Sequence, residues 1–300
     1  MKVVLFGAGA MSCLFASRLA GVADVVLVDR WVEGIEAIRE QGILFEDGAG
    51  SRTIRVRADY PGEHIVPAEL AIVLVKAWQT REVADWLAAY LGPGGLAISL
   101  QNGLGNVEAL GARAFPGTTA EGATLLGPGH VRTGGSGPTH VVAPGRVVDL
   151  LCSAGFECYA CSPNEAEGLL WGKLAVSCGI NALTAILRVP NGELLRRPDA
   201  AGLMILAAEE CAAAARAKGI VLPFLNTAER VQEVARRTAG NRSSMLQDVL
   251  RGAPTECDAI NGAVVEEARR QGIPAPVNSV LWKLVKAAVH SDRSDAQSCA

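Results

Sequence analysis

Three polar side chains recur at every fourth position of an otherwise apolar segment, residues 171–181: Lys173, Ser177 and Asn181. Residues spaced by four lie on one face of a helix, so an ammonium, a hydroxyl and an amide would face a common site. Reduction of a ketone places negative charge on its oxygen, and a lysine ammonium can stabilise that charge and donate the proton. The alternative is a polar helix face that meets only solvent.

A glycine-rich turn, G-A-G-A-M-S, follows the first apolar run of the chain, residues 2–6, and precedes a segment with helical periodicity. This order of strand, turn and helix is typical of a site that binds the pyrophosphate of a dinucleotide at a helix N-terminus. A turn with only a structural role is the alternative. The candidate cofactor contacts in the turn are Gly7, Ala8, Gly9, Ala10, Met11 and Ser12.

Asp29 and Arg30 stand at the end of the second apolar run, residues 23–29. An acidic side chain at this place accepts hydrogen bonds from the ribose hydroxyls of NAD, whereas an arginine pairs with the 2′-phosphate of NADP. The two neighbours therefore favour different cofactors. A solvated strand end is the alternative for either residue.

Two further strand ends carry polar side chains, K-A-W-Q from Lys76 and Q-N-G-L-G from Gln101. Ligands of open α/β sheets bind at the carboxyl ends of the strands. We therefore expect Lys76 and Gln79 to contact the cofactor and the Asn102 amide to orient the nicotinamide ribose or the substrate. The alternatives are an exposed lysine at a helix start and an asparagine in a turn.

Three polar residues in the second half of the chain are weaker candidates by themselves: Asn191, Ser244 and Glu256. Ser244 would equally well cap a helix that starts at Met245. Glu256 would equally well lie in the first turn of a helix, where the dipole favours a carboxylate.

The pattern of apolar residues predicts an α/β domain followed by a helical one. Up to residue 163, short apolar runs alternate with helical segments, as in a parallel sheet covered on both faces, and residues 43–58 predict a hairpin. From residue 164 onward the segments are long and helical. We expect a dinucleotide-binding Rossmann domain over 1–163, an all-helical domain over 164–300, and a mobile tail over 291–300.

Composition excludes several classes of partner. The 28 basic and 31 acidic residues give a net charge of −3, so no basic field favours nucleic acid. The first residues do not resemble a signal peptide, and the most apolar later segment, Ala200 to Ala217, carries Glu209, Glu210 and Arg216. We expect a cytoplasmic protein without a membrane span, in which this segment is a core helix or the interface of a homodimer.

The eight cysteines are irregularly spaced, as expected of reduced thiols in a cytoplasmic protein. Cys158 and Cys161 form a C-x-x-C pair, but no further ligands lie nearby at a spacing that suits a metal. We expect no metal, because Lys173 can supply the electrophilic catalysis that zinc provides in some dehydrogenases.

Seven segments together resemble the ketopantoate reductase (2-dehydropantoate 2-reductase) family over nearly the whole chain. They begin at Gly7 (G-A-G-A-M-S), Lys76 (K-A-W-Q), Gln101 (Q-N-G-L-G), Trp171 (W-G-K-L-A-V-S-C-G-I-N-A-L-T-A-I), Pro190 (P-N-G-E-L), Ser243 (S-S-M-L-Q-D) and Thr255 (T-E-C-D-A-I-N-G). The resemblance implies a Rossmann domain joined to a helical domain like that of 6-phosphogluconate dehydrogenase. It also implies NADPH-dependent reduction of 2-dehydropantoate, a small 2-oxo acid, to (R)-pantoate for coenzyme A synthesis.

The resemblance further implies a role for each matching residue. Lys173 is the general acid, and Glu256 is a second catalytic residue that closes the site against both the cofactor and the substrate. Ala123 contacts the cofactor through its backbone. The implied substrate contacts are Asn102, Lys173, Ser177, Asn181, Asn191 and Ser244.

This sequence departs from the family pattern at three positions. Ser12 replaces the usual third glycine of the turn, and Ser177 stands where the family commonly has asparagine. Asp29 precedes the arginine that reads the 2′-phosphate. Because of Ser177, another small branched 2-oxo acid is an alternative substrate. Because of Asp29, NAD is an alternative cofactor to NADP. A nicotinamide-sensing protein without turnover is a third reading, which the presence of Lys173 disfavours.

Overall fold

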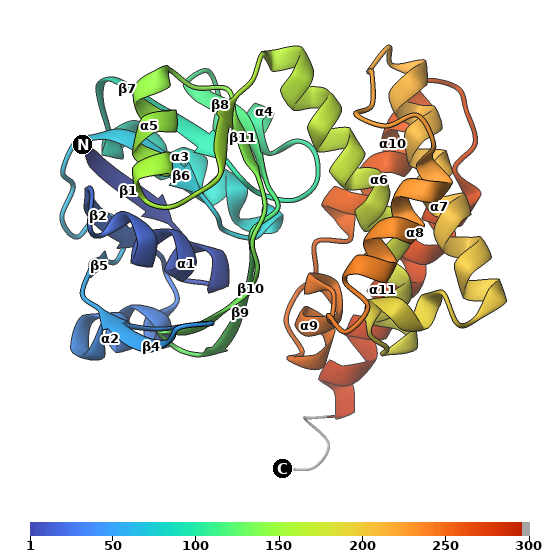
Figure 1. The fold of residues 1–300 in the computed structure, drawn as a ribbon, viewed down its shortest axis with the longest axis horizontal. Helices are drawn as coiled ribbons and strands as arrows, with labels where there is room; N and C mark the ends of the chain where they lie inside the picture. The colour runs from blue at the N-terminus through green and yellow to red at the C-terminus, as the bar shows by residue number, and fades with distance from the viewer. Residues whose placement is uncertain (296–300) are drawn as a thin grey trace. The chain divides into compact units, whose positions relative to one another are not determined.

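The computed structural model describes residues 1–295, which form two compact units. The first unit comprises Met1–Gln101 and Asn106–Ala166, and the second comprises Asn102–Gly105 and the chain from Glu167 onward. The division predicted at residue 164 falls in the first turn of a long helix that begins at Pro163. The short segment 102–105, which the sequence pattern placed in the first domain, groups instead with the helical unit. Figure 1 shows the strands and helices of the two units along the chain.

An eight-stranded sheet forms the centre of the first unit, in the order β12-β11-β8-β7-β6-β1-β2-β5. The six strands from β5 to β8 pair in parallel in the order of a dinucleotide-binding fold, and β11 is antiparallel to β8. The strands are β1 (Lys2–Phe6), β2 (Asp24–Val28), β5 (Arg57–Asp59), β6 (Ala68–Val73), β7 (Leu91–Ser99), β8 (Ala114–Thr119), β11 (Thr139–Val141) and β12 (Cys158–Ala160).

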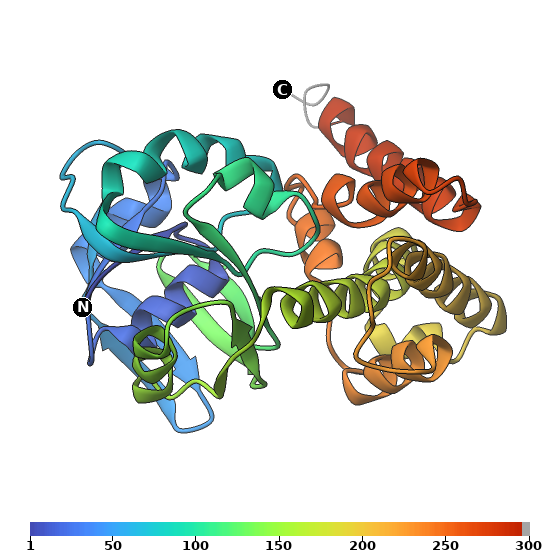
Figure 2. The ribbon, with the colours of Figure 1, turned by 90° about the horizontal axis from the view of Figure 1, so that it is seen from above.

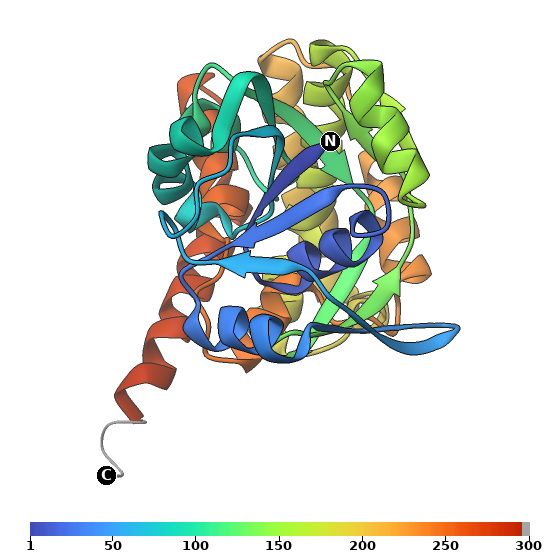
Figure 3. The ribbon, with the colours of Figure 1, turned by 90° about the vertical axis from the view of Figure 1, so that its left-hand side faces the viewer.

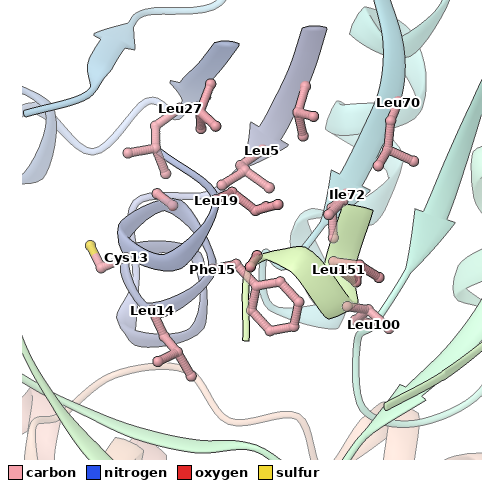
Figure 4. Close-up of a cluster of buried hydrophobic side chains, with 14 of the residues drawn as sticks. Leu5, Cys13, Leu14, Phe15, Leu19, Leu27, Leu70, Ile72, Leu100 and Leu151 are labelled. Atoms are coloured by element: carbon pink, nitrogen blue, oxygen red, sulfur yellow. The ribbon is translucent and has the colours of Figure 1, made fainter. Parts of the chain in front are cut away.

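Helices cover both faces of this sheet because its strands carry apolar residues at consecutive positions. Along β1, Val3 and Leu5 pack with residues of α1 and α5, whereas Val4 and Phe6 pack with residues of α3. Figure 2 shows α3 on one face and α1 and α5 on the other, and Figure 4 shows the cluster around α1. The helices are α1 (Ala10–Leu19), α2 (Val32–Gln41), α3 (Thr80–Tyr90), α4 (Asn106–Leu110) and α5 (Gly145–Ser153).

A second, four-stranded sheet has the order β4-β3-β10-β9. Its strands are β3 (Ile43–Asp47), β4 (Gly50–Ile54), β9 (Gly122–Gly127) and β10 (His130–Gly135). The predicted hairpin is confirmed as β3 and β4, which pair antiparallel and extend from the unit (Figure 3). Strands β9 and β10 were not predicted, because glycines and polar residues interrupt their apolar pattern.

The second unit is helical and its core lies between α6, α7 and the helices that follow. Its elements are α6 (Pro163–Leu187), η2 (Asn191–Leu194), α7 (Pro198–Ala217), α8 (Thr227–Arg237), α9 (Ser244–Leu250), η3 (Asp258–Gly262), α10 (Ala263–Arg270) and α11 (Pro276–Asp295). Gly179 lets α6 approach α7 closely, since a Cβ there would lie 2.6 Å from the Met204 carbonyl oxygen.

Two expectations about this unit need correction. The long helical segments expected after residue 164 include one π-helical turn, η3, which directly precedes α10. Helix α11 reaches Asp295, so residues 291–295 of the expected tail are helical, and residues 296–300 lie outside the described part.

Among the described residues, α6 rather than α7 is the helix long and apolar enough to cross a membrane. However, 61% of its most apolar window is buried inside the structure, and its middle carries Lys173. Both features are those of a core helix.

Candidate active site

The glycine-rich turn leaves the start of α1 open to an anion. Gly7 has φ +122°, and a Cβ there would lie 2.5 Å from the Ser12 Oγ, so the turn requires glycine. A Cβ on Gly9 would meet no heavy atom within 4 Å. Helix α1 has neither a side-chain cap nor an acidic residue in its first turn, so its first N–H groups are available to a phosphate.

Ser12 fits beneath the turn where the family pattern has glycine. The residue is fully buried, and its hydroxyl has no hydrogen-bond partner. Because Gly7 lacks a Cβ, the serine side chain occupies the space below it.

Asp29 holds the glycine-rich turn to the end of β2. One carboxylate oxygen, Oδ2, accepts a hydrogen bond of 2.6 Å from the Ala8 N–H. The other, Oδ1, accepts from the N–H groups of Arg30 (2.6 Å) and Trp31 (3.2 Å). The residue is only 9% exposed. Its carboxylate therefore binds the protein's own backbone through both oxygens, a role that the sequence reading did not include.

Arg30 lies beside α3 with its guanidinium largely exposed. Its Nη1 is 3.3 Å from the Glu82 Oε2, and 59% of its side chain is exposed. The guanidinium also lies over the Trp86 ring, 4.9 Å from the centroid. Because a guanidinium has five N–H donors, this arrangement leaves donors for a phosphate. No sequence pattern indicates Glu82 or Trp86 as site residues, since only the fold brings them to the end of β2.

Lys76 and Gln79 form a short turn after β6. The Gln79 Oε1 accepts from the Lys76 N–H at 3.2 Å, which stabilises the 3₁₀ helix η1 (Ala77–Gln79). The buried Gln101 supports this edge of the sheet, because its Nε2 donates to the Val75 carbonyl (3.0 Å) and the Thr80 Oγ1 (2.7 Å). Gln101 thus joins the ends of β6 and β7 to the start of α3.

Ala123 lies in β9, paired with Thr133 of β10. It is half-buried and packs against the same core cluster as α1. Its strand therefore runs beside the helix whose N-terminus faces the glycine-rich turn.

Asn102 and Glu256 are brought together within the helical unit. The Asn102 Nδ2 donates to the Glu256 Oε2 at 3.2 Å. The segment is fixed by the Leu104 N–H, which donates to the Ala259 carbonyl at 3.1 Å. Gly103 has φ +82°, and a Cβ there would lie 2.5 Å from that carbonyl oxygen. The close approach therefore depends on glycine.

Lys173 interacts electrostatically with Glu256. Although part of the lysine residue is exposed, burial lowers the pKa of its ammonium, and the Glu256 carboxylate partly opposes this by raising it. Burial is the larger of these two effects on the pKa. The ammonium is consequently a stronger acid than an ordinary lysine. Glu256 itself is 6% exposed.

Ser177 and Asn181 continue the face of α6 that carries Lys173. Both are half-buried, while the intervening Leu174 and Cys178 are buried in the core. Within the described residues, neither the Ser177 hydroxyl nor the Asn181 amide makes a hydrogen bond, so both are available to a ligand.

Asn191 is fixed by its neighbours and retains one free acceptor. Its N–H donates to the Asn241 carbonyl at 3.0 Å, and its Nδ2 donates to the Thr238 Oγ1 at 2.9 Å. Its Oδ1 is buried without a partner. An orphaned buried acceptor is costly unless a donor reaches it, and a substrate hydroxyl is such a donor.

Ser243, not Ser244, caps α9. The Ser243 Oγ accepts from the Leu246 N–H at 3.1 Å and from the Thr184 hydroxyl of α6 at 2.7 Å. The alternative reading of Ser244 as the cap is therefore wrong by one residue. The half-buried Ser244 lies at the first position of α9, next to α6.

The groups with possible metal or redox chemistry have structural explanations. The described residues hold one cluster of three potential metal ligands, Asp59, Glu63 and His64. Arg39 pairs with Glu63 and Arg57 with Asp59, so this cluster is an ion-pair network. In the C-x-x-C pair, burial raises the pKa of the Cys158 thiol to about 11, which disfavours the reactive thiolate.

A glycine-rich turn on a Rossmann sheet and a helical unit with a partly buried lysine define a nicotinamide-dependent oxidoreductase. Family models agree over both units: the one described as Ketopantoate reductase PanE/ApbA matches residues 3–144, and the one for its C terminal matches residues 165–289. The chain belongs to the ketopantoate reductase family.

Individual relatives are similar over the full length. A 2-dehydropantoate 2-reductase of Halobacterium salinarum is 34% identical over 304 residues, covering 96% of this chain and 99% of that protein. A ketopantoate reductase structure from Ralstonia eutropha has a TM-score of 0.90 at 31% identity, covering 98% and 100% of the two chains. A D-mandelate dehydrogenase structure with NADH and anilino(oxo)acetate has a TM-score of 0.91 at 25% identity, covering 97% and 99%.

Proposed function

We propose that the protein reduces 2-dehydropantoate to (R)-pantoate with NADPH, using Lys173 as the general acid. The observation that carries this proposal is the partly buried lysine whose ammonium is made more acidic by burial and interacts with Glu256. Such a group matches the need for a cation and a proton donor at a ketone oxygen. Relatives named 2-dehydropantoate 2-reductase over the full length support the choice of substrate.

The residues of the first unit fit a dinucleotide. The open start of α1 would hold the pyrophosphate, and Arg30 would hold a 2′-phosphate. Lys76, Gln79 and Ala123 are proposed as further cofactor contacts. When bound, the nicotinamide supplies the hydride.

The residues of the second unit would orient the substrate and move its proton. The Lys173 ammonium would donate to the carbonyl oxygen as negative charge develops there. Asn181, Ser177 and Ser244 carry donors for the substrate carboxylate, and the orphaned Asn191 Oδ1 would accept from its hydroxyl. Asn102 would hold Glu256 beside Lys173.

We propose NADP rather than NAD as the preferred cofactor. Both oxygens of Asp29 are engaged by backbone N–H groups, which weakens its role as a reader of ribose hydroxyls. Arg30 is exposed and has spare donors. The ratio of NADPH to NADH affinity should therefore fall at least about tenfold in Arg30→Ala, the range of a charge-assisted hydrogen bond.

The direct test is oxidation of NADPH by the purified protein with 2-dehydropantoate, beside Lys173→Ala. Turnover should fall by a factor of about 10² to 10⁴ in the variant, while the dissociation constant of NADPH stays the same. A wild-type protein that binds NADPH but leaves 2-dehydropantoate unreduced would refute the proposed substrate.

A second candidate substrate is another small 2-oxo acid, and Ser177 is the observation in its favour. Serine is shorter than the family's common asparagine, and a structural neighbour at 25% identity is named D-mandelate dehydrogenase. A panel of branched and aromatic 2-oxo acids distinguishes the two. If 2-dehydropantoate is the substrate, kcat/KM is highest for it.

The cytoplasmic location and the homodimer remain predictions. Helix α7 buries eight of its 20 residues in the core and exposes Leu203 (41%) and Leu206 (53%), which supports a partner surface. Light scattering after size exclusion would measure the mass directly: twice the chain mass is the expected result.

A further inference from the structure

The α3 carboxylate of Glu82 competes for the guanidinium that the proposed function assigns to the cofactor. Glu82 and Trp86 are four residues apart on α3 and therefore share one face of the helix. This face meets the Arg30 side chain, with Glu82 paired at 3.3 Å and Trp86 beneath the guanidinium. Arg30 thus has an anionic partner before any cofactor binds.

We propose that Glu82 limits the preference for NADP over NAD by competing with the 2′-phosphate for Arg30. The proposal rests on the proposed function in that Arg30 reads this phosphate. An NADP molecule must either displace the Glu82 carboxylate or bind beside it. In either case Arg30 contributes less to the free energy of NADP binding. NAD carries no 2′-phosphate, so its affinity does not depend on this competition.

The Arg30–Glu82 ion pair is exposed enough for a 2′-phosphate to displace the carboxylate. The side chains are 59% (Arg30) and 45% (Glu82) exposed, so the ion pair is weak and solvent-screened. A phosphate dianion offers more charge and more acceptors than a carboxylate. Trp86 supports the guanidinium from the face of its ring, and this contact does not depend on which anion Arg30 binds.

The other charged group beside Arg30 does not duplicate this role. The Asp29 carboxylate accepts from the backbone N–H groups of Ala8, Arg30 and Trp31, and it is 9% exposed. Glu82 is instead the carboxylate paired with the guanidinium itself.

Glu82→Gln tests the proposal through binding alone, without turnover. Isothermal titration would measure 2′,5′-ADP, which carries the 2′-phosphate, and 5′-AMP, which lacks it. The variant should bind 2′,5′-ADP and NADPH about two- to fivefold more tightly, the range that an exposed ion pair accounts for. Its affinity for 5′-AMP and NADH should stay the same.

Asp85→Asn is the matched control, because Asp85 is an exposed acid on the same helix and takes no part in the pair. An equal gain in affinity for 2′,5′-ADP in Asp85→Asn and Glu82→Gln would overturn the proposal, because it would show that the effect arises from the net charge and not from the ion pair. Weaker 2′,5′-ADP binding in Glu82→Gln would also overturn it, since Glu82 would then position Arg30 for the phosphate.

Arg30→Ala and the double variant separate this inference from the proposed function. If Arg30 reads the 2′-phosphate, Arg30→Ala loses the NADPH preference, and adding Glu82→Gln restores nothing. If Arg30→Ala keeps the preference, the proposed cofactor site is wrong whatever Glu82 does. If it loses the preference but Glu82→Gln alone changes nothing, only the competition is wrong.

Discussion

The Asp29 Oδ2 accepts a hydrogen bond of 2.6 Å from the Ala8 N–H, and this bond joins the end of β2 to the glycine-rich turn. The same carboxylate receives two further backbone N–H groups through Oδ1. An acidic residue at this position is ordinarily read as a ribose ligand and a sign of NAD. Here the contacts indicate that it shapes the turn, whose proposed ligand is the pyrophosphate common to NAD and NADP.

Asp29→Asn should therefore lower the affinities for NADH and NADPH by a similar factor. The amide keeps one oxygen but turns an NH₂ group toward backbone N–H donors, so one buried donor loses its acceptor. We expect a loss of about 1–3 kcal/mol in the free energy of unfolding. Denaturant titration and calorimetry with each cofactor would check this. Asp24 is exposed at the start of β2, so Asp24→Asn is the control. A loss of affinity confined to NADH would contradict the role of Asp29 in holding the glycine-rich turn.

The lowered pKa of Lys173 predicts a limit to activity at alkaline pH. As the proposed general acid, Lys173 must be protonated, so kcat/KM should be steady below the pKa of Lys173 and fall as pH rises through it. Because burial lowers that pKa, the fall should begin below the ordinary value for lysine, about 10.4. In Lys173→Arg the guanidinium keeps its charge across the assayed pH range, so this variant should be slow and its rate should not fall at alkaline pH. An identical limb in Lys173→Arg would assign it to another group.

Glu256→Gln should move the same limb to lower pH. The Glu256 carboxylate raises the pKa of Lys173 and so opposes the effect of burial. Its loss leaves burial unopposed, and the ammonium loses its proton at a lower pH. The pH profile of kcat/KM measures this shift. Glu266→Gln, on the exposed side of α10, should leave the limb in place, and a limb that stays in place in Glu256→Gln would contradict the electrostatic link.

Short-range patterns carried most of what the sequence could predict. The strand, turn and helix around Gly7 and the four-residue spacing of Lys173, Ser177 and Asn181 depend on local periodicity, which the chain displays directly. The βαβ order then predicts the Rossmann sheet. Boundaries were less accurate: the cap of α9 is Ser243, one residue from the position considered.

The contacts that the sequence could not predict are long-range. Asp29 meets Ala8, and Arg30 meets Glu82, only after the sheet has formed. No local sequence pattern distinguishes an aspartate that accepts from backbone N–H groups from one that accepts from ribose hydroxyls. The grouping of residues 102–105 with the helical unit is of the same kind, because it depends on a hydrogen bond from Leu104 to the Ala259 carbonyl.

Gly103→Ala and Gly105→Ala should separate backbone strain from close contact in that segment. Both glycines have left-handed φ values, +82° and +83°, so each alanine should cost about 1–2 kcal/mol. A Cβ on Gly103 would also lie 2.5 Å from the Ala259 carbonyl oxygen, whereas one on Gly105 meets nothing within 4 Å.

The activity of the two variants should therefore differ more than their stability. Gly103→Ala must push residues 102–105 away from η3, which lengthens the 3.2 Å bond between Asn102 and Glu256. Misplacement by about 1 Å can cost up to 10²-fold in rate, so we expect kcat/KM to fall at least tenfold in Gly103→Ala and little in Gly105→Ala. Equal losses would show that the contact with Ala259 does not position Asn102.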